Sequence, residues 1–229
     1  MKVFKVDLDS RANQRILKPS ARPSNNQAYQ VNEVAEKIDK LIRNAQYSND
    51  GIVLNHNKIK EAFFSPFKPQ LKSAQAFLSH SHADKSKALK VKNYLESKAD
   101  HRVFVDSLFW DYKDDVLNEL AKYDNTSKIK DAFTLILRES LEDMIKKYPY
   151  FVFLQSKNSV SLNQDLLGIT YSAWIYEELK IANGLIADST LQESCIKAMR
   201  VSHNITNLLR RFKPISLNGL CNEIFSTLL

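Results

Sequence analysis

Polar and titratable side chains follow two short apolar runs of the sequence. The run AQAFL at 74–78 passes into SHSH at 79–82, and the run RVFVD at 102–106 passes into Ser107. In an open α/β sheet, ligands bind in the crevice beyond the carboxyl ends of the strands. The pattern therefore predicts a ligand pocket, although the same residue types also occur where a strand simply passes into a helix. The candidate lining residues are Ser79, His80, Asp106 and Ser107.

Two further segments supply aromatic rings and a carboxylate. Trp110 and Tyr112 follow the second apolar run, and their faces suit stacking on a flat base, whereas aromatic side chains more often fill a core. In the helical pattern SAWIYEELKIA at 172–182, Glu178 lies one turn after Trp174. If Trp174 faces the core, the Glu178 carboxylate is directed toward the domain. The alternative is that Glu178 is solvated, as most helical glutamates are.

The sequence lacks the patterns of common metal and nucleotide-cofactor sites. The two histidines within 79–82 are not completed by Cys or carboxylates at ligand spacing, so no metal is predicted. Only 4 glycines occur, and neither GxGxxG nor a P-loop sequence is present. A Rossmann cofactor fingerprint and a P-loop NTPase are therefore excluded.

Composition indicates a globular protein. With 229 residues and 44% hydrophobic residues, the chain can form one sizeable core, or a core with an appendage. No apolar run approaches the ~18 residues that span a bilayer, and the charged start MKVFKVDLDS does not fit a signal peptide. Cys195 and Cys221 lack metal-type spacing and are too few for a disulfide framework. We expect a cytoplasmic protein without membrane association, with both cysteines buried.

The formal charge of +7 raises nucleic acid as a partner. Residues 1–72 contain 13 of the 33 basic and 7 of the 26 acidic residues, so nearly all of the excess lies in this first third. No dense basic run with interleaved aromatic residues is present. Solvated surface is the preferred interpretation, and a nucleic-acid-binding role for 1–72 is the weaker alternative.

Apolar periodicity predicts strands alternating with helices after residue 72. Strands are expected at 74–78, 102–106, 150–156 and 199–202, with helices between and after them. This order predicts an α/β domain over 73–229, with a central parallel sheet flanked by helices. Residues 1–72 are expected to form a basic, mostly helical N-terminal extension, with a short edge strand at its start and an amphipathic helix at 31–45.

Taken together, these segments resemble a bacterial TIR (Toll/interleukin-1 receptor) domain. AFLSHSHADKSKALKVKNYLE resembles its first strand and helix, RVFVDSLFWDY its second strand and BB loop, and FVFLQSKNS its third strand. SAWIYEEL is similar to the family's S-x-W-x-x-x-E-L box. The resemblance covers residues 73–185 and implies a flavodoxin-like sheet of parallel strands wrapped by helices.

The resemblance also implies an activity. Many bacterial members cleave NAD⁺ at the nicotinamide–ribose bond with the glutamate of the box, which corresponds to Glu178 here. Thoeris-type anti-phage members make an ADP-ribose-derived signal, cyclic or conjugated, for a separate effector, and TIR enzymes act as homo-oligomers through TIR–TIR contacts. NAD⁺ would be a substrate, so no cofactor is needed. The implied substrate-binding residues are Ser79, His80, Asp106, Ser107, Trp110, Tyr112 and Trp174.

Other members of the family are adaptors without catalysis. A non-catalytic interaction module that recruits partner TIR domains through the BB-loop region at 106–115 is therefore the alternative. The sequence also departs from the family pattern. Ile175 stands where many members carry Cys, the segment 111–150 is long, and no fourth strand is evident after Gly184.

Overall fold

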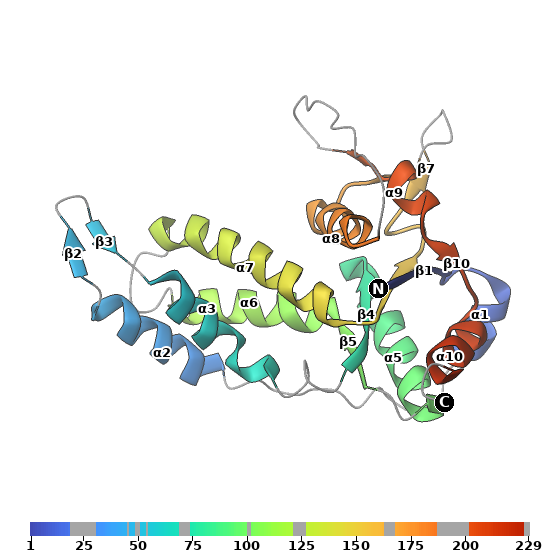
Figure 1. Cartoon of the computed structure of the whole chain (residues 1–229), viewed down its shortest axis with the longest axis horizontal. Helices are drawn as coiled ribbons and strands as arrows, with labels where there is room; N and C mark the ends of the chain where they lie inside the picture. Colours follow the sequence, from blue (N-terminus) through green and yellow to red (C-terminus); the bar gives the residue numbers. More distant parts are fainter. Residues whose placement is uncertain are drawn as a thin grey trace. The chain divides into compact units, whose positions relative to one another are not determined.

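The computed structural model describes residues 1–18, 31–44, 46–48, 51–53, 55–68, 74–99, 102–120, 127–162, 168–186 and 202–226 (Figure 1). The chain divides into two units. Unit 1 comprises Met1–Asn25, Ser73–Ser107 and Ile145–Leu229, and unit 2 comprises Asn26–Lys72 and Leu108–Met144.

Unit 1 contains a five-stranded sheet in the order β10-β1-β6-β4-β5. Every neighbouring pair in this sheet is parallel. The strands are β1 (Lys2–Asp7), β4 (Ala74–His80), β5 (Arg102–Val105), β6 (Tyr150–Gln155) and β10 (Lys213–Pro214). The protein is therefore an α/β protein with a central parallel sheet, as the sequence predicts.

The strand order explains why no fourth strand is evident after Gly184. Counted along the chain from β4, the sheet begins second, first, third, which matches the start of the flavodoxin-like order, and β1 and β10 complete it. The fourth place is taken by β1, which pairs with β6 along its whole length, from Lys2 opposite Tyr150 to Asp7 opposite Gln155. β1 also pairs with β10, so the expectation that the N-terminal segment is an edge strand is wrong.

The inner strands are apolar on both faces, as buried parallel strands usually are. Phe77 of β4 lies opposite Phe104 of β5 and Phe151 of β6. Its ring stacks on both neighbours, with centroids 5.7 and 5.6 Å apart. The ring of Phe212 packs edge-on against Phe151 at 5.7 Å. Because strand side chains alternate between faces, this aromatic row lies on the same face of β4 as Ser79.

Helices flank the sheet of unit 1. α5 (Lys85–Ala99) follows the short 3₁₀ turn His82–Asp84 and contacts β4 and β5. Its inward stripe consists of Ala88, Val91 and Leu95, all buried. α1 (Arg11–Ile16) and α10 (Leu217–Phe225) gather near α5 (Figure 1). Asn13 joins α1 to the end of β1 and to α10. Its side chain donates to the carbonyl of Asp7 at 2.7 Å and accepts from the N–H of Leu217 at 3.0 Å.

α8 (Ala173–Gly184) contacts the end of β4 and lies beside a small antiparallel sheet. That sheet has the order β7-β8-β9, formed by Ser161–Leu162, Gly168–Thr170 and His203–Asn204. α9 (Thr206–Arg210) packs on α8. The predicted C-terminal strand at 199–202 falls almost entirely outside the described residues, as does Cys195.

Unit 2 is mainly helical. Its elements are α2 (Val31–Arg43), the hairpin of β2 (Gln46–Ser48) and β3 (Gly51–Val53), α3 (His56–Phe64), the 3₁₀ turn Ser65–Phe67, most of α6 (Asp106–Leu120) and most of α7 (Ser127–Lys147). α2 and α3 agree with the helices predicted from apolar periodicity. An aromatic cluster fills the core of this unit, made by Phe63, Phe64, Phe67, Phe109 and Tyr112.

The two-unit division changes the boundary predicted at residue 72. Residues 1–25 belong to unit 1, so the N-terminal third is not one extension. Residues 26–72 share unit 2 with 108–144, which lies largely within the long segment that departs from the family pattern. Most of the N-terminal third therefore belongs to the same unit as the long segment that departs from the family pattern.

None of the described helices combines the length and apolar character needed to cross a bilayer.

Candidate functional site

The carboxylate of Glu178 lies at the end of β4. The Ser79 hydroxyl donates a hydrogen bond of 2.5 Å to Glu178 Oε2, and both side chains are 0% exposed. An ionised carboxylate is costly to bury unless hydrogen bonds compensate for lost water. The Ser79 hydroxyl provides one such bond, to Oε2. Glu178 is thus directed into the domain, as the helical spacing predicts.

Local sequence sets the position of Glu178 on α8. The helix begins after Ser172, whose hydroxyl accepts from the N–H of Ile175 at 3.2 Å, a typical N-terminal cap. The buried stripe of α8 is formed by Ile175, Leu179 and Ala182, and Glu178 lies within it. Trp174 is only half-buried, so its ring is less enclosed by the core than the sequence predicts.

A second buried pair joins the ends of β4 and β5. His80 Nε2 lies 3.0 Å from Asp106 Oδ1, and the backbone N–H of His80 donates to Asp106 Oδ2 at 3.1 Å. His80 Nδ1 lies 2.6 Å from the carbonyl oxygen of Ser81. Both ring nitrogens of His80 therefore face acceptors, a geometry that favours the doubly protonated imidazolium.

The same contacts act on the pKa of His80. Burial lowers this pKa, but the charge of Asp106, its hydrogen bond, the Ser81 carbonyl and the more distant Asp84 all raise it. The net result is a pKa above the ordinary value for histidine. These contacts favour the imidazolium form of His80 beside the Asp106 carboxylate.

The two pairs lie on opposite faces of the sheet. Ser79 and His80 are consecutive strand residues, so their side chains point in opposite directions. The structure therefore brings Ser79 together with Glu178, and His80 with Asp106, at one strand end but in two separate clusters. Such an arrangement suits a site that spans the carboxyl end of the sheet, where ligands bind in this fold class.

The remaining predicted residues lie at the start of α6. Residues 106–115 are helical from Asp106 onward, so the expected BB loop is absent from this segment. Ser107 is buried and belongs to unit 1. Trp110 and Tyr112 belong to unit 2.

Tyr112 is enclosed by other rings. It is 1% exposed and packs against Phe63 and Phe67, with centroids 5.1 and 4.9 Å away. This packing differs from the prediction that its ring stacks on a substrate. Trp110 is half-buried, edge-on to Phe109 at 4.8 Å and with Lys113 Nζ 5.9 Å from its ring centre.

A polar cluster at the ends of β1, β4 and β6 was not predicted. Buried Asp84 accepts from the Ser156 hydroxyl, from Asn158 Nδ2 at 3.0 Å and from Lys87 Nζ at 3.2 Å. Lys87 also contacts Asp9, at 3.3 Å. Asp9 lies just after the apolar segment that forms β1. This position indicates a place at the strand ends only when β1 is known to belong to the sheet.

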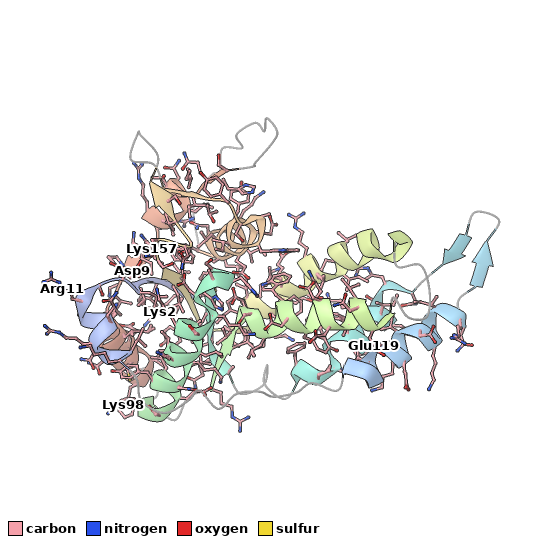
Figure 2. All side chains as sticks on the ribbon, turned by 180° about the vertical axis from the view of Figure 1, so that it is seen from behind. Lys2, Asp9, Arg11, Lys98, Glu119 and Lys157 are labelled. Atoms are coloured by element: carbon pink, nitrogen blue, oxygen red, sulfur yellow. The ribbon has the colours of Figure 1, made fainter. Side chains whose placement is uncertain are left out.

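Asp9 is fixed by the loop after β6. The backbone N–H of Lys157 donates to Asp9 Oδ2 at 2.9 Å, and the two residues lie side by side in Figure 2. This hydrogen bond, together with the Lys87 ammonium, outweighs partial burial and lowers the pKa of Asp9. The cluster closes the strand ends with ion pairs and hydrogen bonds. Among the described residues, no group of three or more His, Cys, Asp or Glu could hold a metal ion.

Comparison of the chain with protein-family models, with curated proteins and with solved structures found no significant match.

Proposed function

We propose that the protein cleaves NAD⁺ at the nicotinamide–ribose bond, with Glu178 as the catalytic carboxylate. The observation that carries this proposal is the position of Glu178, buried beside Ser79 at the carboxyl end of a central parallel strand. Ligands of open α/β sheets bind at this edge. The assignment of this particular reaction rests on the resemblance of SAWIYEEL to the TIR box.

The chemistry requires little from the protein beyond electrostatics. When the bond from the ribose C1′ to the nicotinamide nitrogen breaks, its electron pair stays on nitrogen and nicotinamide leaves as a neutral molecule. Positive charge then develops on the ribose. A carboxylate held in a low-dielectric site stabilises that charge more strongly than one in water. Water or a hydroxyl group of an acceptor then attacks C1′.

Other residues would position Glu178. The Ser79 hydroxyl orients its carboxylate, and the His80–Asp106 pair holds the end of β4 against β5. Because Glu178 is 0% exposed, substrate must displace the groups around it to reach the carboxylate. The proposal therefore includes opening of this strand end on binding.

The test is nicotinamide release from NAD⁺ by the full chain. We expect activity in the natural sequence and a loss of at least about 100-fold in Glu178→Gln, since removing one preorganised electrostatic group costs roughly 10²–10³ in rate. Glu177→Gln, at the next position of α8, is the matched control and should retain activity. Circular dichroism of both variants checks the fold. Activity that survives Glu178→Gln rules out this assignment.

Complete burial of Glu178 favours a second candidate, a non-catalytic interaction module in which Glu178 fixes α8 to β4. In that case the natural protein releases no nicotinamide, and Glu178→Gln alters stability alone. Half-buried Trp110 would then be a candidate contact for a partner domain. Loss of partner binding in Trp110→Ala, with the fold intact, would support this candidate.

The finer features of this function follow only if cleavage is observed. A signal derived from ADP-ribose, a separate effector, self-association through TIR-type contacts and a cytoplasmic location are all implied by the resemblance alone. Mass spectrometry of the products formed from NAD⁺ distinguishes hydrolysed, cyclic and conjugated ADP-ribose.

A further inference from the structure

A pocket of about 350 Å³ lies in unit 1 between the end of α1 and the outer face of α5. Its α5 wall consists of Lys90, Asn93, Tyr94, Ser97 and Lys98. These positions follow the spacing i, i+3, i+4, i+7, i+8, so they form one stripe of the helix. The stripe differs from the buried one that packs on the sheet.

The pocket is positively charged. Lys18, at the end of α1, joins Lys90 and Lys98 in its lining, and none of the described lining residues is acidic. No described carboxylate is recorded in an ion pair with any of these three lysines. Lys98 lies at the C-terminal end of α5 (Figure 2). Three ammonium groups around one cavity form a site for an anion with more than one negative charge.

The remaining lining is suited to a small organic molecule. Ile16 and Leu17 supply an apolar wall, and Tyr94 supplies a half-buried ring. Burial, and to a lesser degree the nearby Cys221, raise the pKa of Tyr94, so its phenol stays a neutral hydrogen-bond donor. A volume of about 350 Å³ lies in the lower part of the range of about 300–1,000 Å³ for small-molecule sites.

We propose that this pocket binds a small phosphate-bearing anion of mononucleotide size. The lysines pair with the phosphate oxygens as point charges, and the Ile16–Leu17 wall and the Tyr94 ring contact the uncharged part of the ligand. The pocket contains neither Ser79 nor Glu178, so this binding does not depend on the proposed cleavage of NAD⁺.

The test is isothermal titration calorimetry of the full chain with ATP, pyrophosphate and adenosine at low and physiological salt. We expect saturable ATP binding that weakens with salt, and adenosine binding at least about tenfold weaker. Charge reversal in the double variant Lys90→Glu, Lys98→Glu should weaken ATP binding by about tenfold or more. The neutral pair Lys90→Gln, Lys98→Gln should give a smaller loss, and it replaces the reversed pair if circular dichroism shows a fold defect.

The double variant Lys37→Glu, Lys58→Glu is the matched control, because these exposed lysines of α2 and α3 lie in unit 2 and together carry the same charge change. It should leave ATP affinity within about twofold. Glu178→Gln should also bind ATP normally, which separates this site from the proposed active site. Absence of saturable binding, equal affinity for adenosine, or an equal loss in Lys37→Glu, Lys58→Glu would each overturn the proposal. If pyrophosphate binds as tightly as ATP does, the proposal is supported, and recognition of the ligand is assigned to the lysines alone.

Discussion

At the residue scale, two consecutive side chains at the end of β4 each contact a buried acidic partner, and the two side chains of β4 differ in kind. Ser79 is a neutral donor to Glu178, whereas His80 forms an ion pair with Asp106. A neutral donor orients a carboxylate without cancelling its charge, and an ion pair largely cancels both charges. The proposed catalytic role is accordingly assigned to Glu178, and the His80–Asp106 pair is assigned a structural role at the ends of β4 and β5.

The His80–Asp106 pair makes stability depend on pH. Since the pKa of His80 is raised in the folded state, the pair's contribution is fully present below the unfolded pKa of histidine. It is lost as the pH rises through the raised folded pKa. We expect urea unfolding to show declining stability across that interval, and Asp106→Asn to flatten the decline and cost about 3 kcal/mol at acidic pH.

An NMR titration of the histidine rings checks the cause. His80 should titrate above ordinary histidine in the natural protein, and Asp106→Asn should lower its pKa because the attracting carboxylate is gone. His203, whose pKa burial lowers, is an internal reference that should not change. A His80 pKa that is the same in both proteins would show that Asp106 does not hold the imidazolium.

At the element scale, β1 is part of the sheet and its removal would expose β6. Phe4 is buried and its ring stacks on Tyr150 of β6, with centroids 6.2 Å apart. Backbone ladders on both sides of β1 and a continuous apolar face make it an inner strand. The N-terminal residues thus stabilise the element that carries the candidate site, because β6 lies between β1 and β4.

Phe4→Ala tests this placement. Truncating a buried phenylalanine should lower the free energy of unfolding by about 3–5 kcal/mol, through lost burial and the cavity left behind. Phe225→Ala is the control, since that ring is 56% exposed and its loss should cost less than about 0.5 kcal/mol. Urea unfolding followed by circular dichroism measures both. Equal, small effects would mean that residues 1–7 are an appendage.

At the scale of the whole molecule, each of the two units is assembled from segments far apart in the sequence. The chain passes from unit 1 to unit 2 and back twice, at the ends of the segments 26–72 and 108–144. Neither the α/β part nor the helical part is therefore a continuous stretch of sequence. A boundary drawn at residue 72 cuts both.

The fragment 73–229 should consequently fail to fold alone. It lacks β1, the fourth strand of the sheet, and it lacks α2 and α3 of unit 2. We expect little cooperative unfolding and poor dispersion of amide NMR signals, with recovery when the fragment 1–72 is co-expressed. The full chain is the reference. A cooperative urea transition of 73–229 by itself would contradict the two-unit division.

Several features of the site follow from local sequence. Polar residues after short apolar runs predicted the ends of β4 and β5 to within two residues, because an apolar run stops near the point where the chain leaves the buried sheet. The inward direction of Glu178 was one of two interpretations of the helical spacing, and the half-buried Trp174 supports it only in part. Glu178 is buried because its neighbours Ile175, Leu179 and Ala182 face the domain.

Other features depend on contacts between distant residues. The entry of β1 into the sheet, the partner of Glu178 and the enclosure of Tyr112 are of this kind. The helix that starts at Asp106 likewise replaces the expected loop, because its aromatic residues join a core shared with Phe63 and Phe67.

The sequence by itself determined the class of fold, the strand ends that carry polar residues and the inward direction of one glutamate. The tertiary structure decided which segments share a sheet, which of the predicted residues meet, and which rings fill a core. The physical reason is that periodicity records only whether a side chain is buried. The identity of its partner is set by strand pairing and packing across long separations, which leave no local pattern in the chain.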